Sequence, residues 1–504
     1  MKKTRILAAL LAGLMLVSSL ASCGTGENSA DATGDDYIPT VTEDESALQD
    51  NLPDDLDFEG DEVTIISRYV EGWTSAEIGV EGLTSEPVND AVFERNKAVE
   101  ERLGVKIISI EDGTSGASAV VNKVAVAVKG GTNDYDAMAA PCYTTLPETL
   151  NGTFVNLRKT LYLDFDQPWW TQGFHDAVEY KGAQYAIIGS MLLSMYRFGF
   201  VTVFNKDMFE DAGQPMLYEY VENGTWTLDK QIELVPLFYE DNGDGIRDKK
   251  GDTYGFISSN YTSVDPYWSA CDVDIITKDG DGEYQYTLDV ERLHGVADKV
   301  LRLFYETGGG TMSFPFMEND AEQAQIRDYF VDGFAAMATL RVLEMENSSM
   351  RNMEQEYGVV PIPKYDQNQE THKTLLHDQF TVVCIPVTVQ DEQLDQVSAV
   401  LEAMSSTSYR IVKPVYYEAT LRTKLAQDPQ SAEMMDIITD NVYIDAGVIY
   451  YSPLNGFHHT FRSVIKSGNN TTVSIFKMKD KATKRSLATI VSKLEKVAAK
   501  QDAD

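Results

Sequence analysis

The chain has 504 residues, of which 43% are apolar, an ordinary globular fraction that supports more than one hydrophobic core. Two lobes or domains are therefore expected. The formal net charge is −37, from 42 basic and 79 acidic residues, and so acidic a surface repels nucleic acid and anionic lipid headgroups and argues against both as partners.

Residues 1–22 have the outline of a signal peptide. Lys2, Lys3 and Arg5 form a positive segment, and residues 6–17 form an apolar run that small residues follow. This run is too short for a membrane-spanning helix of about 20 residues, and no comparable run follows it.

The sequence Leu20-Ala21-Ser22-Cys23 resembles a bacterial lipobox, which implies that Cys23 is the first residue of a lipoprotein and carries acyl chains such as palmitate. The alternative is an ordinary secretory signal with an incidental cysteine. Several acyl chains would hold the protein on the extracytoplasmic side of the cell membrane. Cleavage before Cys23 leaves 39 basic and 79 acidic residues, a net charge of −40.

Residues 23–60 are expected to form a disordered acidic tether. From Gly24 to Asp61 there are thirteen acids and no Lys or Arg, and Gly, Ser, Thr and Asp dominate. Such a composition buries too little apolar surface to order itself, and its like charges extend it.

The folded part opens with alternating strands and helices. Apolar spacing predicts strands at 62–67, 105–110 and 136–140 and helices at 89–103 and 117–128, the first helix ending at Gly104. This is the pattern of a parallel sheet covered by helices. Ligands bind such sheets beyond the carboxyl ends of the strands, so Arg68, Tyr69, Trp73 and Tyr143, in the loops after the first and third strands, are candidate ligand contacts.

Several later stretches resemble family 1 extracellular solute-binding proteins of ATP-binding cassette (ABC) importers. They are "YKGAQYA", "VFNKDMF", "NGTWTLDKQIELV", "DNGDGIRDKKGDTYGF", "GFAAMATL", "EYGVVPIPKYD" and "FHHTFRSVI". The resemblance covers about 440 residues. No single match is specific, and the resemblance rests on many weak matches that occur in the same order as in the family. It implies an α/β, two-lobed periplasmic-binding-protein-like fold of the class II type, with a hinge between the lobes.

The resemblance also implies a chain that crosses between the lobes more than once, near Gly189, His377 and Ile444. Lobe one is then expected at 61–190 plus 376–440, and lobe two at 191–375 plus 441–504. A few residues at such crossings suffice for the lobes to close around a ligand.

The loop from Glu240 to Asp252 resembles a calcium loop. Oxygen-bearing side chains on nearly alternate residues could wrap one cation, and Gly245 permits the sharp turn. The pattern departs from the usual one at its first and last positions, so a structural calcium and an empty acidic loop of Asx turns both remain open. The candidate metal ligands are Glu240, Asn242, Asp244, Asp248 and Asp252.

Aromatic residues suggest a carbohydrate ligand, because sugar rings stack on aromatic planes while charged and amide groups bind the hydroxyls. The alternative for any one aromatic is a place in the core. The candidate ligand-binding residues are Arg68, Tyr69, Trp73, Tyr143, Tyr261, Trp268, Arg341 and Tyr450.

No enzyme signature such as G-x-S-x-G, H-E-x-x-H or a P-loop is present. Two adjacent histidines, His458 and His459, would face apart on a helix, which argues against a metal site there. Cys142, Cys271 and Cys384 are widely spaced and suggest neither a zinc site nor a disulfide framework, although one bridge remains open. The basic run 473–500 is either a docking helix or a last helix whose charges balance the acidic body.

The expected protein is therefore a monomeric solute-binding lipoprotein, not an enzyme, that needs no cofactor. It would capture a solute, expected to be a mono- or oligosaccharide, between its lobes and deliver it to the permease of an ABC importer. The alternative is a secreted glycoside hydrolase, or another surface lipoprotein acting on glycans, because a pair of catalytic carboxylates is recognised only by its spatial separation.

Overall fold

The computed structural model describes residues 49–504 except 250, 318–320, 422–428 and 504. The predicted signal peptide, the lipidated Cys23 and the tether as far as residue 48 lie outside the described residues. Within the described part, no helix is both long enough and apolar enough to cross a membrane.

The end of the predicted tether, residues 49–60, contacts the folded body, so the tether prediction was wrong for this part. Asp50 is 7% exposed, and Arg102 donates to both of its carboxylate oxygens at 2.6 Å. Ser406 donates a further hydrogen bond to Asp50 at 2.6 Å. Composition predicted an extended chain here, but three charge-assisted hydrogen bonds hold it in place.

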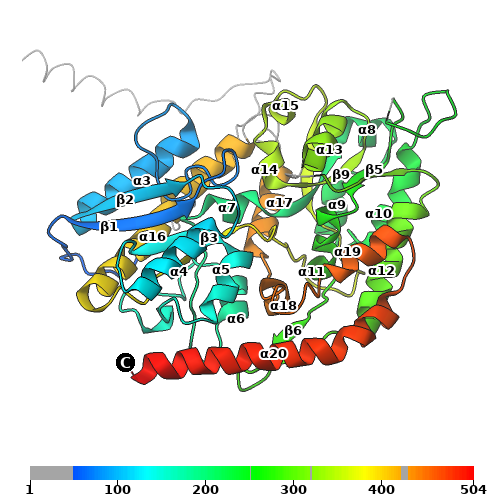
Figure 1. Cartoon of the computed structure of the whole chain (residues 1–504). Helices are drawn as coiled ribbons and strands as arrows, with labels where there is room; N and C mark the ends of the chain where they lie inside the picture. Colours follow the sequence, from blue (N-terminus) through cyan, green and yellow to red (C-terminus); the bar gives the residue numbers. More distant parts are fainter. Residues whose placement is uncertain (1–48, 250, 318–320, 422–428, 504) are drawn as a thin grey trace, which may run out of the picture. The chain divides into compact units, whose positions relative to one another are not determined.

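The first sheet confirms the predicted alternation of strands and helices. It has the strand order β11-β3-β1-β2, in which β1 pairs in parallel with both β2 and β3, and β11 runs antiparallel to β3. Two helices of this part, α3 and α4, pack against the sheet, and α16 packs against α3 (Figure 1). The bounds are β1 Asp61–Arg68, α3 Pro87–Leu103, β2 Val105–Asp112, α4 Ala119–Gly130, β3 Ala137–Pro141, α5 Cys142–Thr149, β11 Thr381–Cys384 and α16 Asp391–Leu421.

Local sequence signals explain both ends of α3. Pro87 stands in the first turn, where its missing N–H costs nothing, and the Glu86 side chain accepts a hydrogen bond from the backbone N–H of Asn89. At the other end Gly104 has φ 59° and donates its N–H to the carbonyl of Glu100. The predicted stop at Gly104 is confirmed, because glycine adopts this left-handed conformation without strain.

The second sheet has the strand order β10-β4-β9-β5-β8. β4 pairs antiparallel with β10 and β9, whereas β5 pairs in parallel with β9 and β8. The "VFNKDMF" stretch spans the end of β4, where Asn205 caps the next helix by accepting from the N–H of Met208. The bounds are β4 Phe200–Asn205, β5 Phe256–Ser259, β8 Thr311–Phe314, β9 Met337–Arg341 and β10 Tyr357–Pro361.

The remaining elements surround the second sheet or connect the two sheets. A hairpin of β6 Ile276–Lys278 and β7 Tyr284–Tyr286 forms a separate two-stranded sheet. The helices are α6 Gln172–Val178, α7 Leu193–Arg197, α8 Lys206–Asp211, α9 Leu217–Glu222, α10 Leu228–Leu234, α11 Pro266–Ala270, α12 Val290–Tyr305, α13 Ala321–Val331, α14 Val342–Met345, α15 Ser348–Arg351, α17 Pro429–Asp440, α18 Ala446–Ile449, α19 Thr460–Ser467 and α20 Thr472–Ala503, with 3-10 turns η1 Leu157–Lys159, η2 Val235–Phe238 and η3 Thr262–Val264.

The chain passes between the two sheets in the segments that join β3 to β4 and β10 to β11. Two later helices contact elements of both sheets' surroundings, the first sheet's on one side and the second sheet's on the other. α17 packs on β10 while it also contacts α16, and the last helix, α20 (red in Figure 1), packs along α12 and β7 and reaches the loops of the first sheet with its C-terminal end. The domain boundaries given above stay a prediction.

Candidate ligand cleft

Residues at the carboxyl ends of β1 and β3 contact the segment that joins β10 of the second sheet to β11 of the first sheet. Arg68, the last residue of β1, donates from Nη1 to the Gln379 side chain at 2.7 Å. The N–H of Tyr143, in the first turn after β3, donates to the carbonyl of Asp378 at 3.3 Å. The predicted loops therefore lie against residues 377–379, which sequence reasoning had identified only as a crossing.

Trp73 joins the two sheets. It follows β1 of the first sheet, and the guanidinium carbon of Arg341, the last residue of β9 in the second sheet, lies 4.8 Å from the centre of a Trp73 ring. This is cation–π distance. The rings of Phe198 and His377 lie edge-on to Trp73, at 5.5 and 5.8 Å between centroids. Two predicted ligand residues, Trp73 and Arg341, thus come together from different sheets.

A cavity of about 380 Å³ lies beside Trp73 and Arg341, within the size range of small-molecule sites. Its walls combine an aromatic ring with guanidinium, carboxylate and amide groups. The lining residues are Gly72, Trp73, Ala321, Ala324, Arg327, Arg341, Leu343, Glu344, Glu346 and Asn347.

The charged groups of this cavity hold one another in place. Glu344 accepts from Arg327 at 3.0 Å and from Arg341 at 3.2 Å. Glu346 accepts from Arg197 at 3.0 Å and from the hydroxyl of Tyr416, on α16, at 2.8 Å. Guanidinium groups donate and carboxylates accept, so the cavity offers both partners that a hydroxyl group needs.

A second group of charged and aromatic side chains lies in the same region. Arg462 of α19 donates from Nε to Asp265 at 2.7 Å and also contacts it through Nη2. The Arg462 guanidinium lies 4.5 Å from the centre of the Tyr261 ring. Tyr451 links this group to the loop after β3, because its ring lies 4.7 Å from that of His459, which is next to Asp265, and 5.9 Å from that of Tyr143.

His377 is neutral near pH 7 in this environment. Burial lowers its pKa well below the usual range, and the positive charges of Arg341 and Arg462 lower it further. Burial also lowers the pKa of Arg68 and raises that of Tyr143. The site therefore carries fixed arginine charges and no histidine charge.

A buried histidine of the crossing between β10 and β11 should make the protein acid-sensitive. Burial lowers the pKa of His372 to about 4, below an unfolded value near 6.5, so the unfolded chain binds more protons as the pH falls. Between pH 7 and pH 5 this group alone should reduce the free energy of unfolding by about 2 kcal/mol.

The expected result for His372→Gln is a smaller loss of stability over that range than wild type shows. Urea unfolding at both pH values measures it. An unchanged difference between the two pH values would contradict the assignment.

Among the described residues, one cluster of histidine and carboxylate groups has the spacing of a metal site. Ligand atoms of Asp265, His458 and His459 lie within 4.8 Å of one another. Contrary to the prediction, the two histidines do not face apart on a helix, because both precede α19 in a turn and their rings lie 4.2 Å apart. Arg462 already pairs with both oxygens of Asp265, however, and its charge opposes a second cation there.

Six of the eight predicted ligand residues do not line the Trp73 cavity: Arg68 and Tyr143, described above, and Tyr69, Tyr261, Trp268 and Tyr450. The Tyr261 ring lies 4.4 Å from the ring of Phe316, tilted against it, and under the Arg462 guanidinium. Tyr69 is half-buried after β1, where its N–H donates to the carbonyl of Asp112. Trp268 and Tyr450 are 3% and 2% exposed, as buried as Arg341, but unlike Arg341 neither lines the Trp73 cavity. The structure therefore places these last two among packed side chains and gives no support to their predicted role as ligand contacts.

Trp268 packs between residues that are distant in sequence. Its ring lies 5.7 Å from the rings of both Phe461 and Phe476, and its indole N–H has no acceptor among the described residues. We expect Trp268→Phe to change the free energy of unfolding by less than about 1.5 kcal/mol, because the lost packing is offset by removal of an unsatisfied donor. Ligand affinity should not change, and calorimetry on the folded variant tests this.

The predicted calcium loop is held by its own side chains. Asp252 is fully buried and accepts from the N–H groups of Asn242 at 3.1 Å and Asp248 at 3.0 Å. Asp241, which the sequence argument had not included, accepts from Gly243 and Gly245 at 2.8 and 3.1 Å. These are the Asx turns of the alternative interpretation, and calcium binding stays a prediction.

The three cysteines of the folded part are buried and free, as expected for Cys384. Burial raises the pKa of each thiol. Neither a disulfide nor a reactive thiolate is therefore formed by Cys142, Cys271 or Cys384.

No protein-family model and no curated protein sequence matches the chain. Solved structures do. The galacto-N-biose-/lacto-N-biose I-binding protein of an ABC transporter from Bifidobacterium longum, in complex with lacto-N-biose, has a TM-score of 0.55 at 15% identity and covers 88% of this chain and 99% of its own.

Two further solved structures are similar over comparable lengths. An ABC substrate-binding protein from Listeria monocytogenes in complex with cycloalternan has a TM-score of 0.51 at 14% identity and covers 86% of this chain and 99% of its own. A solute-binding protein from Thermotoga lettingae bound with alpha-D-tagatose has a TM-score of 0.51 at 16% identity, covering 85% and 100%. The chain therefore has the fold of ABC solute-binding proteins, and the predicted two-lobed α/β fold is confirmed.

Proposed function

We propose that this chain is an extracytoplasmic solute-binding protein that captures a carbohydrate between its two sheets and delivers it to an ABC importer. The observation that carries the proposal is the cavity at Trp73 and Arg341. An aromatic plane from one sheet and a guanidinium from the other meet there, beside carboxylates that accept hydrogen bonds. Sugar rings stack on such a plane and bind such charged groups through their hydroxyls.

The mechanism requires no covalent chemistry. A ligand that contacts Trp73 of the first sheet and Arg341 of the second gains both sets of contacts only when the lobes are closed. It therefore shifts the population toward the closed form by its differential affinity. The permease of the importer would recognise that form.

The anchor belongs to the same proposal. The lipobox-like sequence before Cys23 supports a lipoprotein held on the outer side of the cell membrane, and the acidic segment after it would separate the folded body from that membrane. Mass spectrometry of the protein extracted from membranes tests this step. An acylated Cys23 as the first residue is the expected result.

A thermal-shift screen against mono- and oligosaccharides tests the function, with the sugar from every hit recovered and analysed. A binding protein should be stabilised in proportion to RT ln(1 + [L]/Kd), and the sugar should be recovered intact. Stabilisation with degraded sugar would favour a glycoside hydrolase instead. If none of the sugars changed the melting temperature, a carbohydrate ligand would be rejected. The assignment of the fold, which does not depend on the ligand, would still hold.

A further inference from the structure

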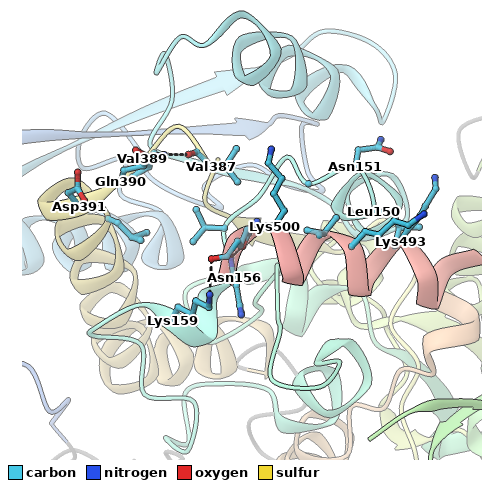
Figure 2. A pocket seen from close by; sticks show the side chains of 16 residues that line it. Leu150, Asn151, Asn156, Lys159, Val387, Val389, Gln390, Asp391, Lys493 and Lys500 are labelled. Atoms are coloured by element: carbon cyan, nitrogen blue, oxygen red, sulfur yellow. Dashed lines mark hydrogen bonds between the residues drawn. The ribbon is translucent and has the colours of Figure 1, made fainter. Parts of the chain in front are cut away.

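A groove unrelated to the cleft lies between the last helix and the loops of the first sheet. Its volume is about 650 Å³, and it shares no lining residue with the Trp73 cavity. Figure 2 shows Lys500 rising from α20 between Val387 and Asn151, with Lys493 further along the same helix. The apolar part of its lining consists of Leu150, Val155, Val387, Val389, Leu394 and Val497.

Three lysines of α20 border this apolar surface. Lys493, Lys496 and Lys500 are spaced by three and four residues, so they lie on one face of the helix and span about 10 Å. Among the described residues none of the three forms an ion pair or a side-chain hydrogen bond. Asp391 is the one carboxylate in the lining.

The charge of this groove is opposite to that of the whole chain. The chain has 79 acidic residues against 42 basic residues, yet the groove gathers three unpaired cations and Lys159 around one acid. Lys159 itself pairs with Asp502 at 2.5 Å. An anion that the rest of the surface repels would therefore be attracted here.

The C-terminal end of α20 is fixed to the loop that forms the other wall. The Gln501 side chain donates to the carbonyl of Phe154 at 2.8 Å and accepts from the N–H of Asn156 at 2.9 Å. A Cβ atom added at Gly152 would lie 3.6 Å from the Val497 side chain, so the loop passes close to the helix at this glycine. The groove is thus a built feature of the fold, with two walls held together by hydrogen bonds.

We propose that this groove binds a single-chain amphiphile with an anionic head group, such as an alkyl phosphate or an alkyl carboxylate. The alkyl chain would cover the valine and leucine side chains, and the head group would lie among Lys493, Lys496 and Lys500. A neutral chain alone would match only the apolar part of the groove, and a small anion alone would match only the lysines. The site lies outside the sugar cleft and does not depend on the proposed function.

Calorimetry of the full chain with dodecyl phosphate and with dodecanoate, both below their micelle-forming concentrations, tests the proposal. One molecule should bind per chain. Triethylene glycol monododecyl ether and inorganic phosphate each supply half of the ligand and should bind at least about tenfold more weakly. Equal binding of either half-ligand would overturn the proposal.

Matched lysine variants on the same helix locate the site. Replacing Lys493, Lys496 and Lys500 together by Gln should weaken dodecyl phosphate binding by about tenfold or more, because three cations at the head group are lost. The control replaces Lys477, Lys479 and Lys481 of the same helix, which line neither the groove nor the Trp73 cavity, and should leave binding within about twofold. Equal losses in both triple variants would show charge attraction alone and overturn the assignment.

A variant of the apolar wall and a variant of the cleft complete the test. Val387→Asp should abolish binding of both amphiphiles while the unfolding curve stays cooperative, because it places a carboxylate under the alkyl chain. Trp73→Ala, in the cleft, should bind dodecyl phosphate as wild type does. If Trp73→Ala removed amphiphile binding, the ligand would be occupying the cleft and the groove proposal would fail.

Discussion

Trp73→Ala is expected to weaken binding of the sugar identified by the thermal-shift screen by about 30-fold to 1,000-fold. Trp73 presents the aromatic plane of the cavity and at the same time supports the Arg341 guanidinium, 4.8 Å from a ring centre. Its removal therefore takes away a stacking surface and leaves the arginine less well oriented. Losses of this size are typical of tryptophans at the centre of a binding site, and Trp73 is partly buried before any ligand binds.

Calorimetry at constant pH and salt measures this affinity. Trp73→Phe keeps an apolar ring and should lose less than Trp73→Ala does. Tyr305→Ala is a suitable control, because Tyr305 is 48% exposed, lies on α12 and does not line the Trp73 cavity. A Trp73→Ala protein that binds the sugar as wild type does would remove Trp73 from the site.

Arg462→Met is expected to lower the free energy of unfolding by about 3–5 kcal/mol. The Arg462 and Asp265 side chains are 9% and 10% exposed, and Arg462 pairs with both oxygens of Asp265. Removing the guanidinium leaves a buried carboxylate without its cation. The cost arises mainly from that unpaired charge and much less from the lost contact.

A double variant separates these two contributions. Asp265→Leu combined with Arg462→Met removes both charges and should recover much of the stability that Arg462→Met loses. Urea unfolding of the three variants and the wild type gives the coupling energy. Additive losses would contradict a direct pairing of the two residues.

The first sheet could be predicted from the sequence, because each of its predicted strands and helices is indicated by residues within one short stretch. β1, β2 and β3 carry alternating or continuous apolar residues, and helix α3 ends at a glycine that the sequence marks clearly. The contact between Trp73 and Arg341 was partly predictable, because Trp73 follows β1 and Arg341 ends β9, and the fold brings the carboxyl ends of these two strands to one cleft.

Other parts of the site depend on contacts between distant residues, which spacing alone does not reveal. Asp265 and Arg462 are 197 positions apart, and no local pattern pairs them. Trp268 was grouped with candidates in loops after strands, yet it lies in α11 and packs against Phe461 and Phe476, which come about 200 residues later. His458 and His459 were placed on a helix that in fact begins after them, so their convergence was missed.

A bound solute should close the two lobes around the Trp73 cavity. Spin labels at Lys97→Cys on α3 and Glu233→Cys on α10 report the distance between the lobes by pulsed electron resonance, since the three cysteines of the folded part are buried. With a bound sugar, confirmed by calorimetry on the same sample, we predict a shorter and narrower distance distribution than in the free protein. An unchanged distribution in the presence of bound sugar would contradict capture by lobe closure.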